Sequence, residues 1–162
     1  MTKEDAPAIL SLRSDEKVMQ YIDKERASSI AEAEKFCAII KDALEKNDGI
    51  TWAIAFQHTH AALIGTIGFW RIIKQHFRAE IGYMLHHDHW GQGIMQEAIE
   101  VVIDYGFGPL QLHSIEAHIN PNNSASAGIL EKNGFIREAY FKEDFFFKGK
   151  FLDSAIYSRV NK

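Results

Sequence analysis

The spacing of apolar residues along the chain changes from helical to strand-like near residue 50. Before that point, apolar residues recur every three or four positions, and this spacing predicts a helix over residues 4–13 and a longer helix beginning after Ser29. Ser29 and Glu32 have the spacing of a capping box, and the glycine turn at 47–49 ends the second helix. The first third of the chain is therefore predicted to be helical.

Beyond residue 50 the chain becomes rich in β-branched and aromatic residues. Segments 50–57 and 62–72 are predicted to form a hairpin whose turn exposes His58 and His60, and a third strand is predicted over residues 78–85. Trp52 and Trp70 alternate with apolar neighbours, which indicates core positions, or else a wall of a substrate pocket.

Helical spacing returns after residue 93. The predicted inner face of this helix consists of Ile94, Ala98, Val101, Val102 and Tyr105, and its polar face of Gln96, Glu97, Glu100 and Asp104. A strand over 113–119, a short helix over 124–133 and two strands over 135–141 and 150–160 complete the order of elements. This order predicts one mixed α/β domain over residues 1–162.

The amino-acid composition restricts the possible classes of function more than it restricts the fold. The 162 residues are 46% hydrophobic and 25% charged, with a formal net charge of −4, so the chain lacks the strong basic field of many nucleic-acid-binding proteins. This balance permits a cationic substrate such as an amine. The single cysteine, Cys37, lies among apolar neighbours and is interpreted as a core thiol. Neither a secretion leader nor a membrane-length apolar run is found, so a cytoplasmic protein is expected.

The stretch HWGQGIMQEA at residues 89–98 joins a strand to a helix through two glycines. A helix N-terminus presents free N–H groups and a favourable dipole, and glycine lets an anion approach the backbone. The sequence contains no G-K-[ST] motif, which a P-loop requires. Gln96 occupies the position at which a dinucleotide-binding fingerprint has its third glycine. The loop is therefore a candidate pyrophosphate site, although an ordinary turn explains the two glycines equally well.

The runs AEIGYMLHHDHWGQGIMQEAIEVVIDYGF and INPNNSASAGILEKNGF together resemble the GNAT N-acetyltransferases. The branch of ribosomal-protein N-terminal acetyltransferases, of the RimJ and RimL type, is the most similar. The resemblance implies a mixed, mostly antiparallel twisted sheet flanked by helices, acetyl-CoA as co-substrate, and no metal. The first strand of the family is missing from this chain. The strand over 50–57 is therefore expected at a sheet edge, covered by a loop or a partner chain such as a second copy, unless the start is truncated.

The resemblance also implies which residues bind the cofactor. The pyrophosphate window consists of Trp90, Gly91, Gln92, Gly93, Ile94 and Met95. Trp90 and Met95 depart from the general family pattern, but backbone amides would do the binding. Met84 and Leu85 would pair with the pantetheine arm, and a backbone N–H of one of them would polarise the thioester carbonyl. Asn123 would reach the pantetheine or phosphate end of the cofactor.

Two side chains are candidates for the proton transfers that acetylation of an amine requires. Glu80, on the strand before the loop, is the candidate general base; its alternative role is an ion pair with Arg71 or Arg78. The tyrosine that many family members use as the acid falls at Leu130 here. Ser126 is the substitute, with an exposed polar position on the helix as its alternative role, and Tyr83 and Tyr140 are weaker candidates.

The identity of the acceptor is left open by the sequence. Neutralising a protein α-amine at pH 7 costs about 1.4 kcal/mol and a lysine about 4.6 kcal/mol, so a single glutamate base favours a protein or peptide N-terminal amine. A small amine, such as a polyamine, amino acid or drug, is the alternative, and a non-catalytic CoA-binding domain is another. The run HHDH at 86–89 suggests a metal-binding or interaction module, but consecutive histidines are expected to point apart, and no metal site is expected.

Overall fold

The computed structural model describes residues 1–56 and 63–162, so the predicted exposure of His58 and His60 lies outside the described residues. Six strands form one mixed sheet in the order β1-β2-β3-β4-β6-β5. All neighbouring strands are antiparallel except β3 and β4, which are parallel. The strands are β1 (Ile50–Ile54), β2 (Gly65–Ile73), β3 (Arg78–Leu85), β4 (Ser114–Ile119), β5 (Ile136–Phe147) and β6 (Lys150–Val160). The predicted α/β fold is confirmed.

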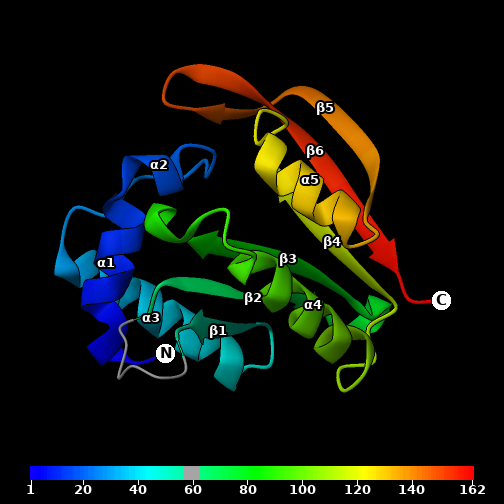
Figure 1. Cartoon of the computed structure of the whole chain (residues 1–162), viewed down its shortest axis with the longest axis horizontal. Coiled ribbons are helices and arrows are strands. Elements are labelled where there is room, and N and C mark those ends of the chain that lie inside the picture. Colours follow the sequence, from blue (N-terminus) through cyan, green and yellow to red (C-terminus); the bar gives the residue numbers. More distant parts are fainter. Residues whose placement is uncertain (57–62) are drawn as a thin grey trace.

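Helices cover both faces of the sheet (Figure 1). They are α1 (Ala6–Ser14), α2 (Glu16–Met19), α3 (Ile30–Glu45), α4 (Ile94–Phe107) and α5 (Ser124–Lys132), with short 3₁₀ turns at Lys3–Asp5, Lys74–His76 and His87–His89. The single turn α2 has no counterpart in the prediction. No described helix is long and apolar enough to cross a membrane.

The sheet divides the apolar interior into two clusters. Phe69, Ile81 and Ile115 pack with Ile99 and Ile103 of α4 on one face. Successive residues of a strand point to opposite faces of the sheet, so Met84, three positions after Ile81 on β3, points to the other face. There it packs against a cluster built from α1 and α3. The buried Cys37 belongs to this second cluster, as the sequence predicted, and burial raises the pKa of its thiol.

The ends of the N-terminal helices follow the predicted capping with one change. Ser29 accepts a hydrogen bond from the Glu32 N–H, as in a capping box. The Glu32 carboxylate, however, accepts from the N–H of Ser28 rather than from that of Ser29. Asp15, which the sequence analysis did not single out, caps α2 by accepting from the Val18 N–H at 2.9 Å.

Three predictions of burial are wrong. Val101 is exposed on α4, because the buried stripe runs through Ile99, Val102 and Ile103 instead. Trp70 is 52% exposed, since a β-bulge between Phe69 and Arg71 leaves it without a partner on β3. The predicted polar residue Gln96 is half-buried and hydrogen-bonds Asn133 at the end of α5.

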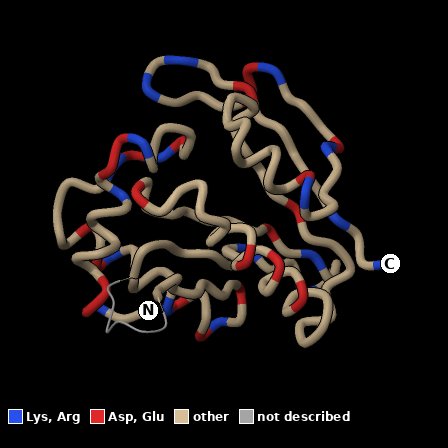
Figure 2. Tube along the Cα trace, in the orientation of Figure 1, with Lys and Arg blue, Asp and Glu red and all other residues tan. Residues whose placement is uncertain are grey.

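The β5–β6 hairpin is longer than predicted. Strand β5 extends six residues beyond its predicted end, and the hairpin exposes Phe145, Phe146 and Phe151. Figure 2 shows lysines at the tip of this hairpin and acidic positions along α4.

Strand β1 lies at the sheet edge, as expected, and no strand of the described residues pairs with its outer side. Trp52 packs edge-on against Phe69 and Tyr105 at the margin of the core, and it also lines a cavity, so both predicted roles are compatible with its position.

Candidate active site

The two-glycine loop ends in a row of unpaired backbone amides. Gly91 and Gly93 have φ angles of 71° and 80°, a region that favours glycine, and Gly93 is the N-cap of α4 without a side-chain cap. Among the described residues, the N–H groups of residues 91–96 have no backbone acceptor; the first α4 hydrogen bond runs from Glu97 to Gly93. Since α4 is 14 residues long, these amides add a helix dipole to their own donors. The loop can therefore bind an anion.

Side chains around the loop leave these amides accessible. A Cβ atom added at Gly91 or at Gly93 meets no other atom within 4 Å, so the space beside both is open. The bulky Met95 packs partly against the core, and its size does not fill the loop. Trp90 is half exposed and donates its indole N–H to the Leu85 carbonyl at 2.8 Å, while Gln92 donates to the Asp88 carbonyl. The departures at Trp90 and Met95 are therefore compatible with anion binding.

Strands β3 and β4 separate immediately before the loop. Their pairing runs only from Arg78↔Ser114 to Glu80↔Glu116, and the strands diverge beyond it (Figure 1). On its other side β3 remains paired with β2 as far as Leu85. Residues 81–85 thus have a free backbone edge toward β4, as the resemblance implied.

Of the two backbone donors predicted on this segment, only one faces the opening. The His86 N–H bonds to the Ile64 carbonyl, on the β2 side, and the Met84 carbonyl also lies on that side, against Gly65. Peptide groups alternate sides along a strand, so the Leu85 N–H points toward the gap and the Met84 N–H does not. Leu85 is therefore the candidate oxyanion donor, and Met84 contributes its side chain to packing against α1 and α3.

Glu80 lies at the point where the strands part, next to a second carboxylate. Glu80 and Glu116 are each 5% exposed and are direct partners across β3 and β4. Arg71 Nη2 lies 3.0 Å from Glu80 Oε2 and 3.3 Å from Glu116 Oε1, so it bridges the pair. Glu116 also pairs with Arg78, and its Oε1 lies 3.6 Å from His118 Nε2. The predicted ion pair of Glu80 with Arg71 therefore exists, whereas Arg78 neutralises the other carboxylate.

The electrostatic surroundings give these two carboxylates different properties. Burial raises the pKa of Glu80 above its ordinary value, and the nearby His118 and Arg71 oppose this effect only in part. A carboxylate whose pKa moves toward neutrality is a better proton acceptor. Glu116 has several cationic partners and is better suited to hold Arg71 in place. The ion pair and the role of base are thus compatible for Glu80.

Ser126 is buried rather than exposed on the helix surface. Its hydroxyl lies 2.8 Å from the Tyr83 hydroxyl, and the Asn123 side chain accepts from its backbone N–H while capping α5. Burial raises the pKa of Tyr83 to about 12, so this phenol keeps its proton at neutral pH. Tyr83 points to the α4 and α5 face, opposite to Glu80. The candidate acid and the candidate base therefore lie on opposite sides of the strand opening.

Sequence reasoning missed two members of this arrangement and ranked a third, Tyr83, as a weaker candidate. Glu116 and His118 lie on β4, where alternation with buried apolar residues could have signalled an inward carboxylate. Tyr83 was ranked low because nothing in the sequence showed that it meets Ser126 across 43 positions. Tyr140, the other tyrosine considered, is half exposed and hydrogen-bonds Asp153 on the β5–β6 hairpin.

Comparison with known proteins identifies the family of the chain. A family profile described as the acetyltransferase (GNAT) domain matches residues 1–136. The chain belongs to the GNAT acetyltransferase family. It is an acetyl-CoA-dependent N-acyltransferase of mixed α/β fold, and the branch resemblance to ribosomal-protein acetyltransferases is supported.

Individual relatives point to more than one acceptor. An uncharacterized N-acetyltransferase of Bacillus subtilis, YoaA, is 36% identical over 160 residues, covering 99% of this chain and 90% of the relative. The spermidine N(1)-acetyltransferase of Vibrio cholerae is 27% identical, covering 94% and 86%. The ribosomal-protein-serine acetyltransferase of Escherichia coli is 34% identical, covering 60% and 55%. The structure of RimL, a ribosomal L7/L12 acetyltransferase in complex with coenzyme A, shares the fold at a TM-score of 0.89 and 21% identity, covering 99% and 90%.

Proposed function

We propose that this GNAT enzyme transfers the acetyl group of acetyl-CoA to a protein or peptide N-terminal amine, with Glu80 as general base. One observation carries the proposal: the β3–β4 pairing stops at the Glu80–Glu116 pair, directly upstream of a loop with free amides. The opening leaves backbone donors of β3 unpaired beside a buried carboxylate of raised pKa. These features support an acyl-transfer site.

In the proposed reaction, acetyl-CoA supplies the thioester that is attacked by the amine. Amides of residues 91–96 bind its diphosphate, and the Leu85 N–H stabilises negative charge on the thioester oxygen. Asn123 is proposed to contact the pantetheine end through its amide nitrogen, because its oxygen already caps α5.

Protons then move on the two sides of the opening. Glu80 accepts a proton from the amine, directly or through one water, on the face opposite to α4. The Tyr83–Ser126 hydroxyl pair supplies a proton to the departing thiolate, with Ser126 on α5 and its hydrogen-bond partner Tyr83 on β3.

An N-terminal amine is the preferred acceptor because one glutamate suffices to neutralise it. At pH 7 this costs about 1.4 kcal/mol, against about 4.6 kcal/mol for a lysine side chain. The ribosomal-protein-serine acetyltransferase among the relatives supports this acceptor class. A polyamine is the second candidate, because a spermidine acetyltransferase is also a relative.

The proposal is tested by measuring thiol release with two matched variants. Glu80→Gln removes the base at nearly constant volume and should lower kcat by about 10²- to 10⁴-fold. Glu116→Gln removes a buried carboxylate from the adjacent strand position and should lower kcat much less. Equal losses in both variants would show that the pair acts only through charge, and an unchanged Glu80→Gln enzyme would exclude Glu80 as the base.

The acceptor class is tested with the same assay over peptides and polyamines. The proposal predicts a higher kcat/KM for a peptide with a free N-terminal amine than for spermidine, and no turnover of the same peptide with a blocked N-terminus. A preference for spermidine would establish the second candidate instead.

A further inference from the structure

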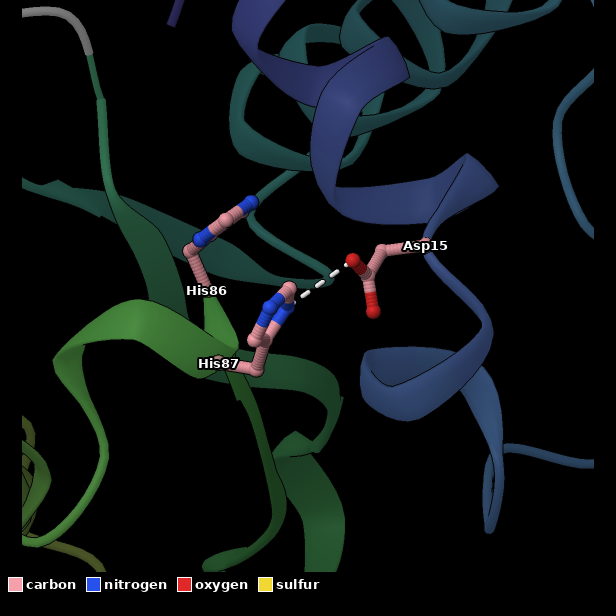
Figure 3. Close-up of side chains that lie close together, drawn as sticks. All are labelled: Asp15, His86 and His87. Carbon is pink, nitrogen blue, oxygen red and sulfur yellow. Dashed lines mark ion pairs between the residues drawn. The ribbon is translucent and has the colours of Figure 1, made fainter.

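We infer that Asp15, His86 and His87 form a binding site for a divalent transition-metal ion of the zinc type. One oxygen or nitrogen ligand atom from each of these residues lies within 4.8 Å of the others. Figure 3 shows His87 between Asp15 and His86, with the three side chains gathered between the N-terminal helices and the end of β3. The site lies outside the acetyl-transfer arrangement, and its metal chemistry does not depend on the proposed function.

The two histidine rings do not point apart, as consecutive residues were expected to do. Their ring centroids are 4.7 Å apart and the ring planes differ by 25°, so the rings stack on one side of the backbone. The 3₁₀ turn at His87–His89, which begins immediately after β3, breaks the alternation of a strand. The argument from sequence against a shared ion is therefore wrong for His86 and His87, whereas the expected absence of a metal stays a prediction that the following experiments test.

One ring nitrogen in the cluster lacks a hydrogen-bond partner. Among the described residues, His87 Nδ1 is the buried side-chain nitrogen or oxygen atom without one. It lies 2.9 Å from Asp15 Oδ2 at ion-pair distance but without hydrogen-bond geometry. Buried polar atoms are nearly always satisfied, and an ion bound beside this pair, in contact with both atoms, would give the nitrogen a partner.

The Asp15 carboxylate is already oriented to supply an oxygen. Its Oδ1 accepts from the Val18 N–H at 2.9 Å as the cap of α2, which leaves Oδ2 facing His87. The helix cap therefore holds the carboxylate in place and leaves one oxygen available to an ion.

A second carboxylate lies behind the rings. Asp88 Oδ1 is 3.2 Å from His87 Nε2, on the far side of the ring from Asp15, and Asp88 Oδ2 is 3.4 Å from His86 Nδ1. Histidine ligands of metal ions almost always donate their other ring N–H to a carboxylate or carbonyl, which fixes the tautomer. Asp88 therefore occupies the place of an outer partner for His87.

The ligand set selects the class of ion. Two imidazole nitrogens and one carboxylate oxygen suit Zn²⁺ and related first-row ions rather than Mg²⁺ or Ca²⁺. At Zn–ligand distances of about 2.0–2.1 Å, tetrahedral ligands lie about 3.3 Å apart. The stacked imidazole rings must therefore rotate so that a nitrogen of each points to the same ion. The side chains of Asp15, His86 and His87 are 18%, 23% and 26% exposed, which gives water access to the fourth position.

The other cluster of this kind does not compete for the ion. Glu80, Glu116 and His118 also bring three ligand atoms within 4.8 Å. Both carboxylates there are neutralised by Arg71 or Arg78, and a guanidinium at 3.0 Å from Glu80 repels a cation. No arginine or lysine pairs with Asp15 among the described ion pairs.

Bound metal would connect two parts of the fold. Asp15 lies between α1 and α2, and His86 and His87 lie between β3 and the anion-binding loop. An ion at this point would fix the segment that carries Trp90 and the loop glycines against the N-terminal helices.

The site is tested by titrating untagged protein with Zn²⁺ alone in a calorimeter and with Co²⁺ in an absorption spectrometer. We expect one ion per chain and the intense visible bands of tetrahedral Co²⁺. Asp15→Asn keeps the helix cap, because asparagine is an equally good N-cap, but removes the ligand charge. It should weaken Zn²⁺ binding at least about tenfold, and Asp88→Asn about 10- to 100-fold.

Matched controls separate a built site from adventitious binding by surface histidines. His89→Gln removes a histidine of the same run that lies outside the cluster and should leave the affinity within about twofold. His87→Gln, which caps no helix, should abolish the Co²⁺ bands even if Asp15→Asn disturbs folding. Absence of Zn²⁺ binding, or equal weakening by His87→Gln and His89→Gln, would overturn the proposal.

Discussion

Replacing Gly93 by alanine separates backbone strain from anion binding, because the chain contains a matched control. Gly93 has φ +80° and Gly149, in the β5–β6 turn, has φ +78°. At both positions an added Cβ meets nothing within 4 Å, so neither variant creates a clash. Each alanine must adopt a left-handed conformation, at a cost of about 1–2 kcal/mol. Both variants should therefore lose about 2–8 °C in Tm, at about 2–4 °C per kcal/mol for a chain of this size.

Binding of acetyl-CoA should distinguish the two variants. At Gly93 the new Cβ stands beside amides of residues 91–96, where it hinders approach of the diphosphate. Loss of one hydrogen bond to a charged group costs about 1.5–3 kcal/mol, which corresponds to about a 10- to 100-fold weaker Kd. Gly149→Ala should bind acetyl-CoA like the wild type. Equal Kd values in both variants, measured by calorimetry, would refute the assignment of this loop to the diphosphate.

Three further results are expected. The rate should fall as the pH drops through the raised pKa of Glu80, because only the ionised carboxylate accepts a proton. The acidic limb of the pH–rate profile should therefore have its midpoint above 4.5, the ordinary pKa of a glutamate, and it should be absent in Glu80→Gln. Tyr83→Phe and Ser126→Ala should each lower kcat by about 10²-fold, and the double variant should be no slower than the slower single variant if the two hydroxyls act as one unit. Cys37, at 3% exposure and with a raised pKa, should react with a thiol reagent only after unfolding; rapid reaction of the native protein would contradict its place in the core.

The sequence predicted those parts of the fold that depend on local spacing. Helical periodicity placed α3 and α4, strand composition placed β1 to β4, and the glycines of the loop marked the start of α4. These signals come from residues close together in the chain, whose structure is decided by the spacing of apolar residues and by helix caps.

Features that depend on distant residues escaped the prediction. The bulge that exposes Trp70 arises from the register of β2 against β3. Glu116 meets Glu80 only because β3 and β4 are parallel neighbours, and Tyr83 meets Ser126 only because α5 returns beside β3. Within the glycine loop, the sequence predicted free backbone amides, and the structure describes them for residues 91–96.

The central claim is that amides of residues 91–96 bind the diphosphate of acetyl-CoA beside the opening at Glu80. Chemical-shift mapping of ¹⁵N-labelled protein with CoA tests it most directly, with pantetheine, which lacks the diphosphate, as the control. CoA should shift the amide signals of residues 91–96 and of Leu85, whereas pantetheine should shift Leu85 and leave the loop signals in place. Unchanged loop signals at saturating CoA, or equal loop shifts with pantetheine, would contradict the claim.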